Sequence, residues 1–118
     1  MKLDISIEND VTVLAVSGAL NRDSVARFKR AVGEALDQQR RDFVIDLSKV
    51  VSVDSAGLEI LTDLHRQCEE QLGMVRVCGA DETMSKIFEM TRLDKQFELH
   101  ENVAAALGSF AQHAVTRR

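Results

Sequence analysis

The chain has 118 residues, 45% of them hydrophobic and 29% charged, and its formal net charge is −4 at pH 7. This is the size of one compact domain, and the balance of apolar and charged residues argues against a disordered or fibrous protein. The negative charge and the lack of Trp and Tyr argue against a nucleic-acid surface, which needs clustered Lys and Arg with stacking aromatics.

The N-terminus runs directly into an alternating pattern, with no targeting segment before it. No apolar run approaches the roughly 20 residues of a membrane helix, so we expect no direct insertion into a membrane and a cytoplasmic location. A single domain is predicted over residues 1–112. Residues 113–118 are expected to be a frayed C-terminal tail.

Two strands are predicted at the start of the chain. Apolar residues at alternate positions of 3–7 predict a half-buried strand with one face in water. After a turn at 9–10, residues 11–17 read as a second strand covered on both faces and ended by Gly18.

A helix and a central strand follow. Capping residues lie within 21–24, and the helix shows one apolar stripe: Val25, Phe28, Val32 and Leu36. Residues 43–47 are apolar apart from Asp46 and predict the central strand. Since a helix separates it from the second strand, we expect the two strands to be parallel.

The run 50–53 then leads directly into a second helix at Ser55. Its stripe has three- and four-residue spacings: Leu58, Leu61, Leu64, Cys68 and Leu72. Asp54 and Ser55 therefore stand at a helix N-terminus. Free N–H groups and the positive dipole end suit a capping oxygen or a phosphate there.

The alternation of strand and helix continues to the end of the chain. Gly73 is predicted as a left-handed helix cap, followed by a parallel strand at 74–78 that Gly79 closes. A short helix capped within 81–83, a weak edge strand at 97–99 and a last helix from Asn102 to about Ala111 complete the pattern. The order ββαβαβαβα predicts an α/β fold with a mixed, mainly parallel five-stranded sheet and about four helices.

Few residues suggest chemistry. The three His residues are scattered, the two Cys stand ten apart, and the six Gly occur singly, so no metal, P-loop or dinucleotide site is predicted. Cys68 and Cys78 read as reduced, buried thiols. Asp46 and Asp54 have neither an oxyanion donor nor a pocket beside them, so we expect no enzyme, no catalytic residue and no cofactor.

Ser55 has two interpretations on residue type alone. Ser and Asp are both good N-caps, so plain capping is the simpler one for Ser55 and for Asp54. Gly57 likewise has a simple interpretation, close packing of the helix. The second interpretation of Ser55 is that of a phosphate acceptor.

Residues 46–58 read Asp-Leu-Ser-Lys-Val-Val-Ser-Val-Asp-Ser-Ala-Gly-Leu. This run resembles the signature of the STAS domain family, and the chain resembles that family along nearly its whole length. Residues 18–21 resemble its Gly-x-Leu-Asp turn, and residues 86–93 its Leu-Phe-x-Met-Ser/Thr-Gly-Leu segment. The three motifs occur in the family's order.

The resemblance implies the STAS fold and the function of an anti-sigma factor antagonist. In that family a partner that is both anti-sigma factor and serine kinase phosphorylates the Ser after the motif's Asp, here Ser55. The unphosphorylated form binds the partner and the phosphorylated form releases it. The implied partner-binding residues are Asn21, Asp54, Ser55, Ala56, Gly57, Leu58 and Glu59.

Two positions depart from the family pattern. Asn21 stands where the family usually has Asp, and Arg92 where it often has Gly, so whether a kinase acts on Ser55 stays open. Asp-hydroxyl-Ala-Gly also resembles STAS subunits of bacterial lipid-transport ABC complexes, which would make an ABC-transporter subunit the partner. The sequence leaves the oligomeric state and the identity of the partner open.

Overall fold

A computed structural model describes the backbone of residues 1–116 and the side chains of residues 1–110. Strands and helices follow the predicted order over this part of the chain. Their bounds are β1 Lys2–Glu8, β2 Val11–Leu20, α1 Val25–Asp37, β3 Asp42–Val53, α2 Ser55–Glu70, β4 Met74–Cys78, α3 Glu82–Met90, β5 Glu98–His100 and α4 Val103–Thr116. Short 3-10 turns lie at Arg22–Ser24 and Leu93–Lys95.

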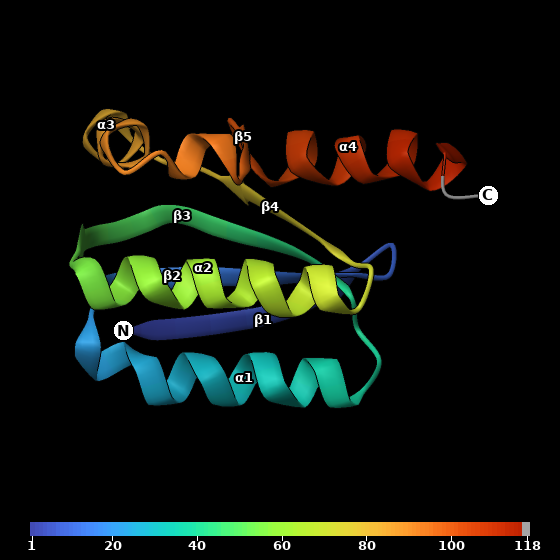
Figure 1. The fold of residues 1–118 in the computed structure, drawn as a ribbon, viewed down its shortest axis with the longest axis horizontal. Helices are drawn as coiled ribbons and strands as arrows, with labels where there is room; N and C mark the ends of the chain where they lie inside the picture. Colours follow the sequence, from blue (N-terminus) through green and yellow to red (C-terminus); the bar gives the residue numbers. More distant parts are fainter. Residues whose placement is uncertain (117–118) are drawn as a thin grey trace.

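The strands form one sheet in the order β1-β2-β3-β4-β5. β1 is antiparallel to β2, and each later pair is parallel, as in a mixed, mainly parallel sheet. β3 lies at its centre and β5 at one edge, which confirms both predictions (Figure 1).

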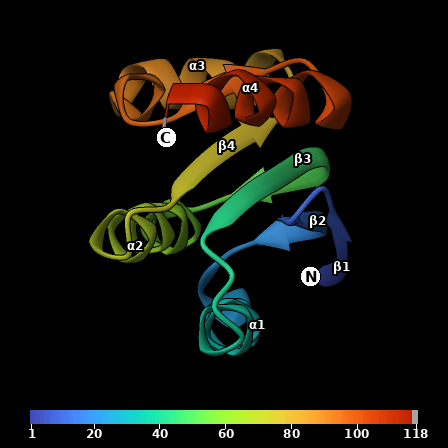
Figure 2. The same cartoon turned by 90° about the vertical axis from the view of Figure 1, so that its right-hand side faces the viewer.

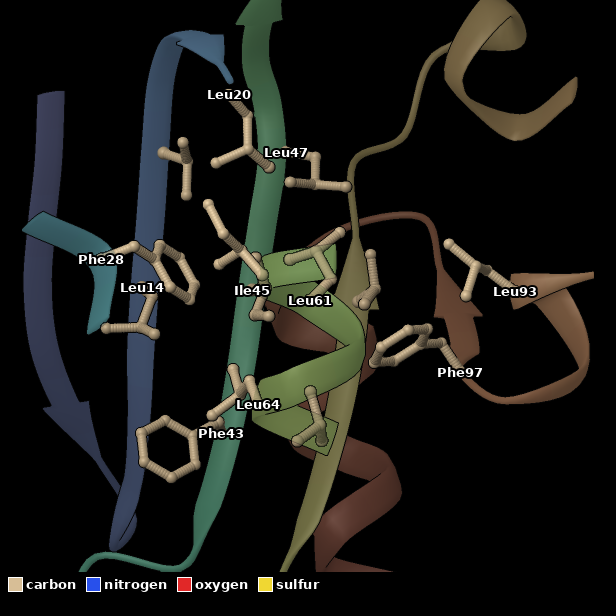
Figure 3. Packing of buried hydrophobic residues seen from close by; sticks show 14 of the residues in the cluster. Leu14, Leu20, Phe28, Phe43, Ile45, Leu47, Leu61, Leu64, Leu93 and Phe97 are labelled. Atoms are coloured by element: carbon tan, nitrogen blue, oxygen red, sulfur yellow. The ribbon is translucent and has the colours of Figure 1, made fainter. Parts of the chain in front are cut away.

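Helices cover both faces of the sheet. α1 and α2 lie side by side on one face, and α4 lies across the other (Figure 2). The larger core lies under α1 and α2, where Ile45 of β3 is fully buried between Leu14 of β2 and Val77 of β4 (Figure 3). α3 adds Met84 and Phe88 to the same core.

β2 and β3 both run further than predicted. Gly18, at φ 86°, does not end its strand but lies at a register irregularity, and β2 continues to Leu20. β3 continues to Val53 because Gly18 and Leu20 of β2 still pair with Val50 and Val53. The strands therefore carry the chain directly to the start of α2.

The prediction that β1 is half-buried was wrong. Leu3 packs against the core, but Ile5 and Ile7 on the same face are 52% and 50% exposed. β2 is covered on both faces as predicted, with Val13 on the α4 side and Leu14 on the α1 side. β1 stands at the edge of the sheet, beyond the reach of most of the helical layer (Figure 2).

The end of α2 also differs from the prediction. Leu72 follows the end of the helix and is 80% exposed, so it does not belong to the buried stripe. Leu72, not Gly73, has the left-handed conformation, at φ 61°. Gly73 is needed for another reason, because a Cβ there would lie 1.9 Å from the carbonyl oxygen of Arg41.

The C-terminal third follows the prediction with shifts of a few residues. Phe97 precedes β5 and is buried in the core, so the edge strand begins one residue later than predicted. α4 extends beyond the predicted end near Ala111 to Thr116. Fraying of 113–118 stays a prediction, and residues 117 and 118 lie outside the described part of the chain.

Candidate functional site

The C-terminal ends of β2 and β3 meet at the start of α2 and form one corner of the molecule. Leu20 ends β2 beside Val53, the last residue of β3. The N–H of Asp54 then donates to the carbonyl oxygen of Leu20 at 3.3 Å. The corner is therefore held by backbone pairing, and its position is fixed by the sheet.

Asp54 is the residue that caps α2. Its backbone is extended, with φ −115° and ψ −177°, and its Oδ1 accepts a hydrogen bond from the N–H of Gly57 at 2.8 Å. Its Oδ2 accepts from the N–H of Arg22 at 3.4 Å. The carboxylate thus joins the start of α2 to the turn after β2.

Ser55 is the first residue of α2 and is exposed. None of the hydrogen bonds among the described residues involves its hydroxyl, because Asp54 provides the capping oxygen. Capping is therefore assigned to Asp54, and the hydroxyl of Ser55 faces solvent beside the positive end of a helix of 16 residues.

Gly57 is buried at the contact between α2 and β2. A Cβ at this position would lie 2.1 Å from the carbonyl oxygen of Leu20 and 2.9 Å from a methyl carbon of Val53. Only glycine lets the first turn of α2 come this close to the strand end. The space beside Gly57 is therefore filled by the chain itself.

The remaining predicted partner-binding residues on α2 differ in exposure. Glu59 is exposed, like Asp54, whereas Ala56 and Leu58 are half-buried. Leu58 also packs against the core. The outer surface at the start of α2, from Asp54 to Glu59, consequently combines two carboxylates, one hydroxyl and a small apolar area.

Asn21 lies in the turn that Asp54 contacts. Its Oδ1 accepts from the N–H of Asp23 at 3.0 Å, and its own N–H donates to Ser24 Oγ at 3.2 Å. These bonds form a capping box around the 3-10 turn. The structure thus brings Asn21 to the same corner as Ser55, with its side chain bound within its own turn.

Val51 is a surface residue that sequence reasoning missed. It is 81% exposed on β3, and a shallow groove of about 140 Å³ separates this end of β3 from α3, lined by Val50, Val51, Ser52, Val53, Asp81, Thr83, Met84 and Ile87. The signal was the alternation within 50–53, which places Val51 opposite buried Val50. The β3 residues that line the groove immediately precede Asp54 in the chain.

The thiols lie away from this corner. Burial, with a smaller contribution from the charge of Asp42, raises the pKa of Cys68 to about 12. Burial and the charge of Asp46 do the same for Cys78. Both are free thiols, and such pKa values make them poor nucleophiles at neutral pH.

Metal-binding clusters and membrane-spanning helices are both absent from the part of the chain that the structure describes. It holds no group of three or more His, Cys, Asp or Glu side chains arranged to bind a metal ion. Among its helices, none has the length and apolar character needed to span a bilayer.

The backbone conformation at Arg92 explains why the family motif often has Gly at this position. Its backbone is left-handed, at φ 63°, directly after α3. Glycine adopts this conformation with the least strain. The position therefore favours Gly for a backbone reason that is unrelated to the corner.

Comparison with known proteins found a matching family model and similar bacterial proteins. The family model described as "STAS domain" matches residues 2–106. The anti-sigma-F factor antagonist RsfB of Mycobacterium tuberculosis is 30% identical over 103 residues, which cover 87% of this chain and 84% of RsfB.

Solved structures show the same fold. An anti-sigma factor antagonist from Mycobacterium paratuberculosis superposes with a TM-score of 0.82 at 25% identity, covering 92% of each chain. The Bacillus cell fate determinant SpoIIAA in its phosphorylated form superposes with a TM-score of 0.74 at 16% identity, covering 92% of this chain and 99% of SpoIIAA.

Proposed function

Because this chain belongs to the STAS domain family, we propose that it is an anti-sigma factor antagonist, which binds an anti-sigma factor and is switched off by phosphorylation of Ser55. One observation carries the proposal. Ser55 is exposed at the first residue of α2, and its hydroxyl is free of the capping role that Asp54 fills. A hydroxyl in this state can accept a phosphate without the loss of a structural hydrogen bond.

The binding surface in this proposal is the outer side of the corner. Asp54, Ser55 and Glu59 offer exposed polar groups, and Ala56 and Leu58 offer a partly accessible apolar area. Asn21 shapes the adjacent turn. Gly57 contributes by its close contact with Leu20, which fixes the direction in which α2 leaves the sheet.

The switch follows from charge at this surface. A phosphate on Ser55 would add about −1.5 to −2 charge near neutral pH, beside the exposed carboxylates of Asp54 and Glu59. The helix end tolerates this charge within the free chain. A closely packed interface formed against a neutral hydroxyl does not, because the phosphate would have to lose water on binding.

The kinase activity belongs to the partner in this proposal. The anti-sigma factor would bind the nucleotide and transfer its γ-phosphoryl group to Ser55 Oγ, which releases ADP and the hydroxyl proton. This chain would supply only the acceptor and the docking surface, and it would act in the cytoplasm, without enzymatic activity of its own.

The test is affinity capture with the unphosphorylated chain, followed by incubation with the captured partner and Mg·ATP. A partner with a kinase-type ATP-binding domain and a phosphate mapped to Ser55 by mass spectrometry are expected. An ABC-transporter subunit as the captured partner would instead favour the transporter alternative.

Binding of variants to the same partner then tests the switch. Ser55→Asp should weaken binding by on the order of 1–3 kcal/mol, and Ser55→Ala should bind while accepting no phosphate. Gln67→Glu is the matched control, since it adds one negative charge to an exposed position of α2 well away from the corner. Equal affinity of Ser55→Asp and the parent would contradict the phospho-switch.

A further inference from the structure

β1 leaves an apolar edge of the sheet uncovered. It pairs with β2 on one side only and ends the strand order on the other (Figure 2). Ile5 and Ile7 on this strand are 52% and 50% exposed. The opposite edge strand, β5, has only three residues, so β1 is the longer open edge. Such an edge can pair with another strand.

The hairpin geometry shows which backbone groups of β1 point outward. Asn9 and Asp10 form a two-residue turn with φ values of 53° and 66°, and Glu8 lies opposite Val11. In such a hairpin the residues flanking the turn bond to each other, and bonded and non-bonded pairs then alternate. The N–H and C=O groups of Leu3, Ile5 and Ile7 consequently face away from β2.

The sequence of β1 is complementary to itself when two copies run antiparallel and are centred on Ile5. Lys2 then lies opposite Glu8, Leu3 opposite Ile7, and Asp4 opposite Ser6. Each end of the paired strands then has one Lys2–Glu8 pair of opposite charge, and the apolar residues meet on one face of the joined sheet.

Neighbouring registers lack this match. Centring on Asp4 would place two Asp4 carboxylates opposite each other, and centring on Ser6 would place Asp4 opposite Glu8. Like charges directly opposite are destabilising. Of these three registers, the charges favour the one centred on Ile5, which also joins the outward backbone groups of Leu3, Ile5 and Ile7 to one another.

We propose that β1 binds a second copy of this chain, strand to strand and antiparallel, centred on Ile5. The two sheets become continuous across a two-fold axis. Ile5 and Ile7 of both copies lie together on the face that carries α1, which removes the exposed apolar strip. This surface is independent of the Ser55 corner, so its test does not depend on the proposed function.

The first test is disulfide cross-linking of Ile5→Cys. In the proposed register the two residues at position 5 form a bonded pair with Cα atoms about 5.5 Å apart, within the range of a disulfide. Ser6→Cys, also exposed, is the control, because each Ser6 lies opposite Asp4. Ile5→Cys should cross-link at least about tenfold faster. The native Cys68 and Cys78 are buried and should not interfere.

The second test is a charge exchange followed by sedimentation. Lys2→Glu and Glu8→Lys should each lower the dimer affinity by about two- to tenfold, and the double variant Lys2→Glu/Glu8→Lys should restore it. Unchanged melting temperatures show that the variants fold. A parent that stays monomeric up to about 1 mM, or Ile5→Cys cross-linking no faster than Ser6→Cys, would overturn the proposal.

Discussion

The carbonyl oxygen of Leu20 occupies the space that a side chain at Gly57 would need. A Cβ there would lie 2.1 Å from that oxygen, and the same oxygen accepts the hydrogen bond from the N–H of Asp54. The end of β2 and the first turn of α2 are therefore in direct backbone contact. Since this contact holds the corner that carries Ser55, it links the stability of the fold to the candidate site.

Gly57→Ala should destabilise the protein although alanine favours helices. Moving α2 away from Leu20 should cost about 1–3 kcal/mol or more, which exceeds the gain in helix propensity. Gly33→Ala on α1 is the matched control, because nothing lies within 4 Å of its Cβ, and it should stabilise by about 0.5–1 kcal/mol. Urea melts of both variants measure the difference. A Gly57→Ala variant as stable as the parent would show that α2 can move away from Leu20 without a loss of stability.

Asp54 and Ser55 should differ in their effect on stability. Asp54→Ala should lower the free energy of unfolding by about 1 kcal/mol, since the N–H of Gly57 loses its acceptor. Ser55→Ala should change it by less than about 0.5 kcal/mol, as expected for an exposed site that makes no capping bond. Thermal melts distinguish the two, and a larger loss in Ser55→Ala would reverse the assignment of the cap.

Ile45→Asp should unfold the protein. Ile45 is fully buried on the central strand, and an unpaired charge there costs several kcal/mol, comparable to the stability of a small domain. Val51→Asp on the same strand should retain a cooperative melt, because Val51 is 81% exposed. Circular dichroism melts of the pair check this, with a native-like melt of Ile45→Asp as the contrary result.

Arg92→Gly should stabilise the chain by about 0.5–1 kcal/mol. A non-glycine residue in the left-handed region is strained, and glycine removes this strain at the cost of a more flexible unfolded chain. Lys86→Gly within α3 is the control and should destabilise by about 1 kcal/mol. Chemical denaturation measures both. A loss of stability in Arg92→Gly would mean that the Arg92 side chain makes a contribution larger than the strain.

Alkaline pH should destabilise the fold through Cys68 and Cys78. Burial raises the pKa of both thiols from 9.0 to about 12, so above pH 9 the unfolded chain releases protons that the folded chain retains. The stabilising contribution is complete below about pH 9 and falls as the pH rises towards 12. Cys68→Ala/Cys78→Ala should show a weaker decline between pH 9 and 11 in melts. Equal declines would exclude the thiols as the cause.

The sequence alone determined the elements and their order, because apolar periodicity is a local property. The runs at 11–17, 43–47 and 74–78 are strands, and the stripe that includes Phe28 and Val32 lies on a buried helix face. β3 at the centre followed from the same patterns, since a continuous apolar run must be covered on both faces. The position of Ser55 at the start of a helix was also readable from its neighbours.

The tertiary structure decided what depends on contacts between distant residues. Asp54 and Ser55 are both residue types that can cap a helix. Asp54 is the cap because its backbone is extended, and the hydrogen bond from its N–H to Leu20 holds it in that position. β2 continues past Gly18 because it still pairs with β3 there. The close approach of Gly73 to Arg41 determines the path of the chain after α2. Ile5 and Ile7 follow the pattern of a buried face but stay exposed, because an edge strand is buried only if another element or another chain covers it.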